Sequence, residues 1–128
     1  MIHLVLCGHG TFGSSLFESL SMFLPEISEV SVIDFHKDMG VSELTDLVRL
    51  KLDELGNQPT IFVTDMVGGA PFKTCAIEIL DKQNKLVIAG INLTALLDLY
   101  FQREEDLFVV AKRAVQVSKE STDFYPNE

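Results

Sequence analysis

Short apolar runs that alternate with helical segments are the feature that most constrains the fold of this chain. The runs cover residues 2–6, 30–35, 60–64 and 86–91, and they are largely apolar rather than alternating. Such strands are typical of a parallel sheet with helices on both faces. The sequence therefore predicts a three-layer α/β sandwich with a mostly parallel, doubly wound sheet of strand order 2-1-3-4.

The segments between these runs have the spacing of amphipathic helices. Residues 14–24 follow the first run, and residues 95–101 follow the fourth. The second helix has one apolar face, made of Leu44, Leu47, Val48, Leu52 and Leu55. Gly56 ends this helix, and Pro71 begins the next one, because proline is tolerated in a first helical turn.

The C-terminal part departs from this pattern. Residues 104–113 are compatible with a helix, whereas residues 114–119 alternate like a half-exposed edge strand. Residues 122–128 are polar, and we expect them to form a loose tail. With 128 residues, the chain is long enough for one domain, which we place at residues 1–121.

Composition excludes several classes of function. A net charge of −9 argues against nucleic acid and is compatible with a basic protein partner. Cys7 and Cys75 lie in apolar surroundings, which suits a reducing cytoplasm better than a disulfide framework. No run approaches the roughly 20 apolar residues of a membrane span, and no signal peptide is evident. We expect a soluble cytoplasmic domain with no cofactor and, since His3 and His36 lack ligand spacing, no metal.

A histidine flanked by glycines follows the first predicted strand. His9 lies between Gly8 and Gly10, and Thr11 and Phe12 lead into the first predicted helix. The amide groups at a helix start favour a negative group such as a phosphate. Glycines at such a turn allow another molecule to approach the imidazole closely. His9 is therefore a candidate phosphate-handling residue, with Gly10, Thr11 and Phe12 as supporting residues.

A second glycine turn follows the third predicted strand. Asp65 precedes Gly68, Gly69 and Ala70, which lead into the next helix. In a sheet of order 2-1-3-4, the first and third strands are neighbours, and ligands bind at their carboxyl ends. We expect Asp65 to accept a hydrogen bond from one nitrogen of His9 and to leave the other as nucleophile. The amides of both turns would then bind the phosphoryl oxygens.

Each of these residues also has a structural interpretation. His9 is compatible with a turn histidine bonded to a backbone carbonyl, and Asp65 with a loop or N-cap carboxylate. The two turns together favour the functional interpretation for both residues. Cys7 is two residues from His9, but its apolar setting favours packing over nucleophilic chemistry. Asp34 is interpreted as a loop or crevice-wall residue.

These stretches together resemble the IIA component of the mannose-type sugar phosphotransferase system. The resemblance is carried by residues 8–10, 32–35, 65–72 and 87–93, in order and at family-like spacing. It spans residues 1 to about 100 of the chain. Four positions depart from the family pattern, namely Gly13, Ala70, Lys73 and Thr94. The resemblance therefore does not identify which residues near His9 would contact the phosphate.

The resemblance implies a function and a set of partners. The histidine matching His9 takes a phosphoryl group on Nε2 from the phosphocarrier HPr, while Asp65 holds Nδ1. The group then passes to a IIB component, which phosphorylates sugar imported through the membrane IIC/IID permease. Family members are homodimers with an exchanged C-terminal strand, a role for which residues 115–119 are suited. The alternatives are a regulatory phosphosensor of the same fold and a small α/β hydrolase that uses Cys7 or His9.

Overall fold

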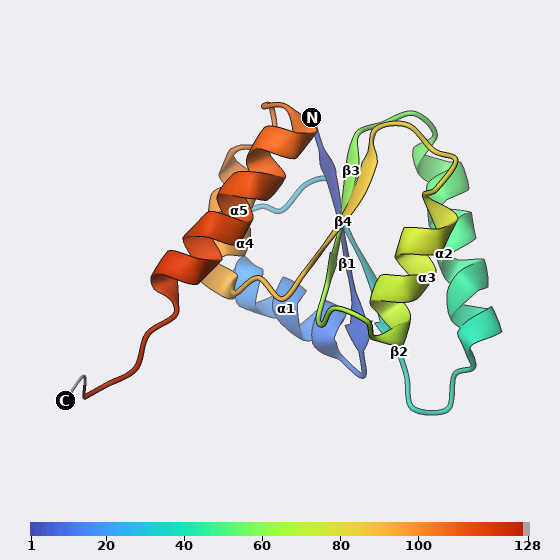
Figure 1. Ribbon diagram of the computed structural model, residues 1–128, viewed down its shortest axis with the longest axis horizontal. Helices are drawn as coiled ribbons and strands as arrows, with labels where there is room; N and C mark the ends of the chain where they lie inside the picture. The colour runs from blue at the N-terminus through green and yellow to red at the C-terminus, as the bar shows by residue number, and fades with distance from the viewer. Residues whose placement is uncertain (127–128) are drawn as a thin grey trace.

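The four apolar runs form one parallel sheet in the computed structural model, which describes residues 1–126 (Figure 1). Its strands are β1 (His3–His9), β2 (Val30–Phe35), β3 (Thr60–Thr64) and β4 (Lys85–Ala89). They are hydrogen-bonded in the order β2-β1-β3-β4, and every pair is parallel. This arrangement confirms the predicted α/β class and strand order.

Helices cover both faces of the sheet. They are α1 (Phe12–Ser21), α2 (Val41–Leu55), α3 (Ala70–Glu78), α4 (Leu93–Phe101) and α5 (Leu107–Ser121). In Figure 1, α2 and α3 lie on one side of the sheet, and α1, α4 and α5 lie on the other. The described residues contain no helix with the length and apolar character needed to cross a membrane.

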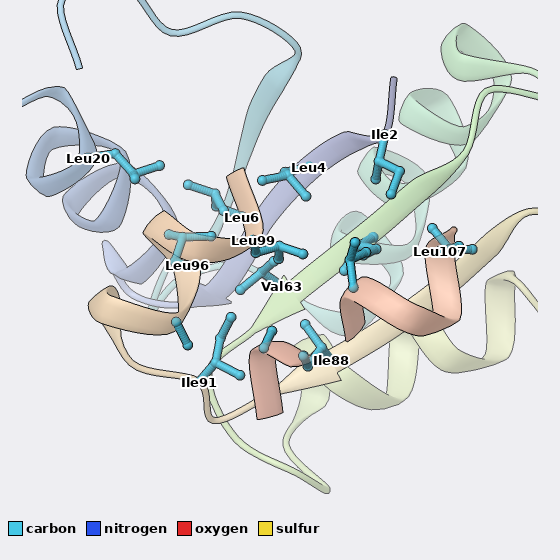
Figure 2. Close-up of a cluster of buried hydrophobic side chains, with 14 of the residues drawn as sticks. Ile2, Leu4, Leu6, Leu20, Val63, Ile88, Ile91, Leu96, Leu99 and Leu107 are labelled. Atoms are coloured by element: carbon cyan, nitrogen blue, oxygen red, sulfur yellow. The ribbon is translucent and has the colours of Figure 1, made fainter. Parts of the chain in front are cut away.

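The sheet separates two apolar cores. Leu4 and Leu6 of β1 face the larger core with residues of α1, α4 and α5 (Figure 2). The alternate residues Val5 and Cys7 face a smaller core with residues of α2 and α3. All four side chains are fully buried. Because successive side chains of a strand point to opposite faces, both faces of β1 must be apolar, as its sequence shows.

The prediction of a C-terminal edge strand, exchanged between subunits, is wrong. Residues 115–119 lie within α5. Asp106 begins this helix by accepting hydrogen bonds from the backbone N–H groups of Phe108 and Val109. Leu107, Val110 and Ala114 then recur at helical spacing and are buried against the sheet. The alternating pattern covers only six residues, whereas the helical pattern covers the whole of α5, and the helix therefore forms. Of the predicted tail, residues 127–128 lie outside the described residues.

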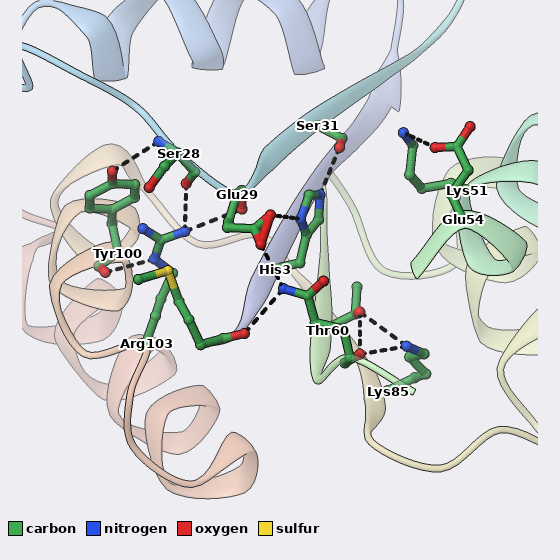
Figure 3. Close-up of polar contacts among 12 residues, drawn as sticks. His3, Ser28, Glu29, Ser31, Lys51, Glu54, Thr60, Lys85, Tyr100 and Arg103 are labelled. Atoms are coloured by element: carbon green, nitrogen blue, oxygen red, sulfur yellow. Dashed lines mark hydrogen bonds and ion pairs between the residues drawn. The ribbon is translucent and has the colours of Figure 1, made fainter. Parts of the chain in front are cut away.

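A polar network holds the amino-terminal end of the sheet, away from the turns singled out above (Figure 3). Nδ1 of the buried His3 lies 3.1 Å from Oε2 of Glu29, and Nε2 lies 2.7 Å from Oγ of Ser31. The buried Arg103 donates to the backbone oxygen of Ser28 at 2.8 Å and lies 3.8 Å from the ring centroid of Tyr100. His3 therefore has a structural role, as its position inside a predicted strand indicates.

Candidate active site

His9 is the last residue of β1, and its side chain is 44% exposed. The chain turns immediately after it, at Gly10, whose φ of +60° favours glycine. The N–H of Gly10 donates to the backbone oxygen of Phe35 at 2.8 Å, which attaches the turn to the end of β2. β1 and α1 thus present an imidazole at the carboxyl edge of the sheet.

Asp65 follows β3 and binds His9 twice. Its Oδ2 lies 2.7 Å from Nδ1 of His9 and accepts the backbone N–H of the same residue at 2.9 Å. Its Oδ1 accepts the N–H of Met66 at 3.0 Å. Since an ionised carboxylate only accepts hydrogen bonds, Nδ1 carries the proton and the neutral ring keeps its lone pair on Nε2.

The electrostatic setting keeps Asp65 ionised. Partial burial by itself raises the pKa of this carboxyl, but the hydrogen bonds from the backbone and ring of His9 outweigh it. The pKa of Asp65 therefore lies below its ordinary value. A negative charge held against Nδ1 stabilises a positive charge that develops on the imidazole during a reaction at Nε2.

The start of α3 lies directly against the imidazole. A Cβ atom placed on Gly69 would lie 2.8 Å from Cε1 of His9 and 3.0 Å from Cγ of Met66. Gly69 is the N-cap residue of α3, so the unsatisfied amide groups of this helix begin beside the ring. Gly68, with a φ of +82°, allows the turn that brings them there. Of the predicted residues, Gly69 thus lies next to His9, and Gly68 and Ala70 precede and follow it in the chain.

The start of α1 is arranged differently. Thr11 is its N-cap residue, but the Thr11 hydroxyl accepts from Ser15 at 3.1 Å instead of capping the helix. The ring of Phe12 packs over Gly8, where an added Cβ would lie 2.5 Å from it. The N–H of Ser14 donates to Oδ1 of Asp34 at 3.0 Å. Asp34 therefore binds the first turn of α1 rather than forming only a wall of the crevice.

Phe35 is a neighbour of the site that the sequence interpretation missed. Its ring centroid lies 5.9 Å from that of His9, and the two residues are partners in the β1–β2 register. The signal was available, because a parallel pairing places the last residues of neighbouring strands side by side. On the other side of His9, Met66 and Val67 are exposed apolar residues in the loop after Asp65.

Cys7 belongs to the core and not to this site. It is fully buried, as is Cys75 of α3, and both are free thiols. The hydrogen bond between the two thiols, in which Cys75 is the donor when its pKa is raised, acts together with burial to raise the pKa of Cys75. Thiols in such surroundings are poor nucleophiles. This placement agrees with packing and gives no support to a hydrolase that uses Cys7.

The fold and these two turns define an α/β protein with a histidine–carboxylate pair at the switch point of its sheet. Among known families, a model of the PTS system fructose IIA component, EIIA-man, matches residues 3–116. The PTS system fructose-specific EIIA component of Bacillus subtilis is 30% identical over 105 residues, which cover 81% of this chain and 72% of that protein. The chain therefore belongs to the EIIA-man family of phosphotransferase-system components.

Further relatives agree with this assignment. The PTS system mannose-specific EIIAB component of Escherichia coli K12 is 29% identical over 106 residues, which cover 82% of this chain but only 33% of that relative. The mannose/sorbose specific IIA subunit from Enterococcus faecalis has the same fold, with a TM-score of 0.91 at 21% identity and coverage of 98% and 96%. Family membership supports a phosphocarrier role in sugar uptake.

Proposed function

We propose that His9 accepts a phosphoryl group from the phosphorylated carrier HPr and passes it to a IIB component. The observation that carries this proposal is the 2.7 Å contact between Nδ1 of His9 and Oδ2 of Asp65. It orients the ring and leaves Nε2 as the nucleophile, on a side chain that is 44% exposed and accessible to a partner.

The transfer requires no group beyond this chain and its partner. The lone pair of Nε2 forms a bond to phosphorus while the bond from phosphorus to the donor's histidine nitrogen breaks. The released electron pair stays on the donor nitrogen. The proton on Nδ1 stays in its hydrogen bond to Asp65, whose charge stabilises the positive charge that develops on the His9 ring. The amides at the start of α3, beside Gly69, are placed to bind the phosphoryl oxygens.

Partner docking is supported by charge and by the apolar rim of the site. The chain carries a net charge of −9, which favours docking of a partner with a basic surface. We propose that HPr docks through such a surface. Met66 and Val67, 55% and 73% exposed, provide apolar contacts next to His9. We place these encounters in the cytoplasm, with the IIC/IID permease reached only through IIB.

We also propose that the chain works as a homodimer through the open edge of β4. A groove of about 550 Å³ runs between β4 and α5 and is lined by Leu86, Ile88, Phe108 and Val115, among others. Phe108 and Val115, 65% and 38% exposed, give this groove an apolar lining that is open in the monomer. Phe108→Glu should convert a dimer to a monomer in light scattering, whereas Phe101→Glu, at an exposed phenylalanine outside the groove, should not. A monomeric wild type would contradict this part of the proposal.

The phosphocarrier proposal is tested by labelling. The protein is incubated with labelled phosphoenolpyruvate, enzyme I and HPr, and the same is done for His9→Ala and for the control His36→Ala. His36 is an exposed histidine outside the site. We expect acid-labile, base-stable label on the wild type and on His36→Ala only. Label on His9→Ala would contradict the proposal.

The onward step separates a carrier from a regulatory phosphosensor. Labelled protein is freed of HPr and mixed with a IIB component. A carrier transfers its label to IIB about as fast as it was labelled by HPr, whereas a phosphosensor keeps the label. Retention of the label would favour the regulatory alternative.

A further inference from the structure

A carboxylate from the neighbouring strand binds the first turn of α1. Asp34 of β2 accepts the N–H of Ser14 on Oδ1 at 3.0 Å and the hydroxyl of Ser14 on Oδ2 at 2.6 Å. The helix provides no such group itself, since the Thr11 side chain makes no cap hydrogen bond and the first turn has no acidic residue. Asp34 thus does for α1 what an N-cap side chain does for most helices.

The contact is close because Gly13 leaves room for it. A Cβ atom on Gly13 would lie 2.5 Å from the backbone oxygen of Leu6 and 2.9 Å from Oδ1 of Asp34. Neither a backbone oxygen nor a carboxylate held by two hydrogen bonds can easily give way. The first turn of α1 is therefore packed against both β1 and β2, and its position depends on Asp34.

This turn also determines where His9 lies. Asp34 is the register partner of Gly8, and the next residue, Phe35, is the partner of His9. The backbone oxygen of Phe35 accepts the N–H of Gly10 at 2.8 Å. The end of β2 therefore binds the β1–α1 connection on both sides of its glycine turn, while Asp65 binds His9 from the side of β3.

We propose that Asp34 is a positioning residue for the His9 site. It holds the β1–α1 turn that presents the imidazole. Because it occupies an amide at the start of α1 with a negative charge, it also opposes anion binding at that helix start. The kinetic part of this inference rests on the proposed phosphoryl transfer, whereas the part on anion binding does not.

The kinetic test compares three variants. Asp34→Ala removes both acceptors, Asp34→Asn keeps an acceptor for the Ser14 N–H, and Asp106→Ala removes the corresponding contacts at the start of α5, outside the site. We expect kcat/KM for transfer from phosphorylated HPr to fall about tenfold in Asp34→Ala, because small displacements of a reacting group slow transfer. Asp34→Asn should recover most of the rate. Asp106→Ala should lower the Tm by about as much as Asp34→Ala does, but it should not lower kcat/KM.

The anion test needs neither HPr nor phosphoryl transfer. Amide NMR spectra are followed while inorganic phosphate is added. In the wild type we expect shifts confined to the amides of residues 68–70 and 72, since Pro71 has no N–H, and in Asp34→Ala additional shifts at Gly13 and Ser14. If phosphate also shifts Gly13 and Ser14 in the wild type, or if Asp34→Ala transfers at the wild-type rate, the inference is overturned. Absence of labelling in every variant, with these shifts present, would instead contradict the proposed function alone.

Discussion

One oxygen of Asp65 accepts both the ring and the backbone N–H of His9, at 2.7 Å and 2.9 Å. The carboxylate therefore fixes the end of β1 and the orientation of the imidazole together. The other oxygen is held by the N–H of Met66, so the carboxylate itself has little freedom to rotate. Such a group both orients a nucleophile and stabilises the charge that forms on it.

Replacement of Asp65 should therefore slow transfer strongly. In Asp65→Asn the negative charge is lost, and the amide must place its NH2 group against either His9 or the Met66 N–H, both of which are donors. We expect kcat/KM for phosphoryl transfer to fall by about 10²-fold, within the range of positioned proton and charge partners. The control is Asp81→Asn, an exposed aspartate beside Lys82. Equal rates for both variants would remove Asp65 from the mechanism.

Gly69 should tolerate no side chain. Its φ and ψ of −73° and 165° suit alanine, so the cost of Gly69→Ala comes from the Cβ placed 2.8 Å from Cε1 of His9. We expect at least a tenfold loss of transfer rate with little change in Tm. Gly40→Ala is a matched control, since Gly40 is the N-cap of α2 with similar angles and an added Cβ there would be 4.0 Å from its neighbour. A fully active Gly69→Ala would show that the ring has room to move.

His3 should make stability depend on pH. Burial lowers the pKa of His3 below its ordinary value of 6.5, although the hydrogen bond and charge of Glu29 act in the opposite direction. The folded protein therefore binds fewer protons than the unfolded chain just below pH 6.5, and its free energy of unfolding decreases as pH falls through this range.

Urea unfolding between pH 8 and pH 5 measures this effect. We expect the wild type to lose stability below about pH 6.5, the usual histidine range, and His3→Phe to lose less. His36→Phe, at an exposed histidine, should retain the wild-type slope. A wild type whose stability rises on acidification over this range would contradict the sign of the His3 shift.

Transfer from HPr should slow as salt is added. The net charge of −9 attracts a basic carrier over a distance, and this attraction is screened at high ionic strength. We expect kcat/KM to fall several-fold between about 0.01 M and 0.15 M salt, where the screening length shortens from about 30 Å to about 8 Å. Rates that do not change with ionic strength would argue against electrostatic docking.

Much of the fold followed from local patterns in the sequence. The runs at residues 30–35 and 60–64 coincide with β2 and β3, and strand order followed from the alternation of strands and helices. The structure of the C-terminal segment could not be predicted in this way. The alternation at residues 114–119 is a local pattern, whereas the burial of Val110 and Ala114 depends on packing against the sheet. Tertiary contacts decide such ambiguous segments.

The site shows the same division. The pairing of His9 with Asp65 could be predicted because both follow neighbouring parallel strands. The contacts of Asp34 with Ser14 and the approach of Gly69 to the ring depend on how α1 and α3 pack at the sheet edge. No spacing in the sequence reports these distances, so they required the structure.

The position of the phosphoryl group on the His9 ring tests the roles of His9 and Asp65 directly. Protein labelled with ¹⁵N in its histidines is phosphorylated through HPr and examined by NMR for coupling between nitrogen and phosphorus. We expect coupling at Nε2 of His9 and a protonated Nδ1, as the contact of Nδ1 with Asp65 requires. A phosphoryl group on Nδ1 of His9, or on any other residue, would contradict these roles.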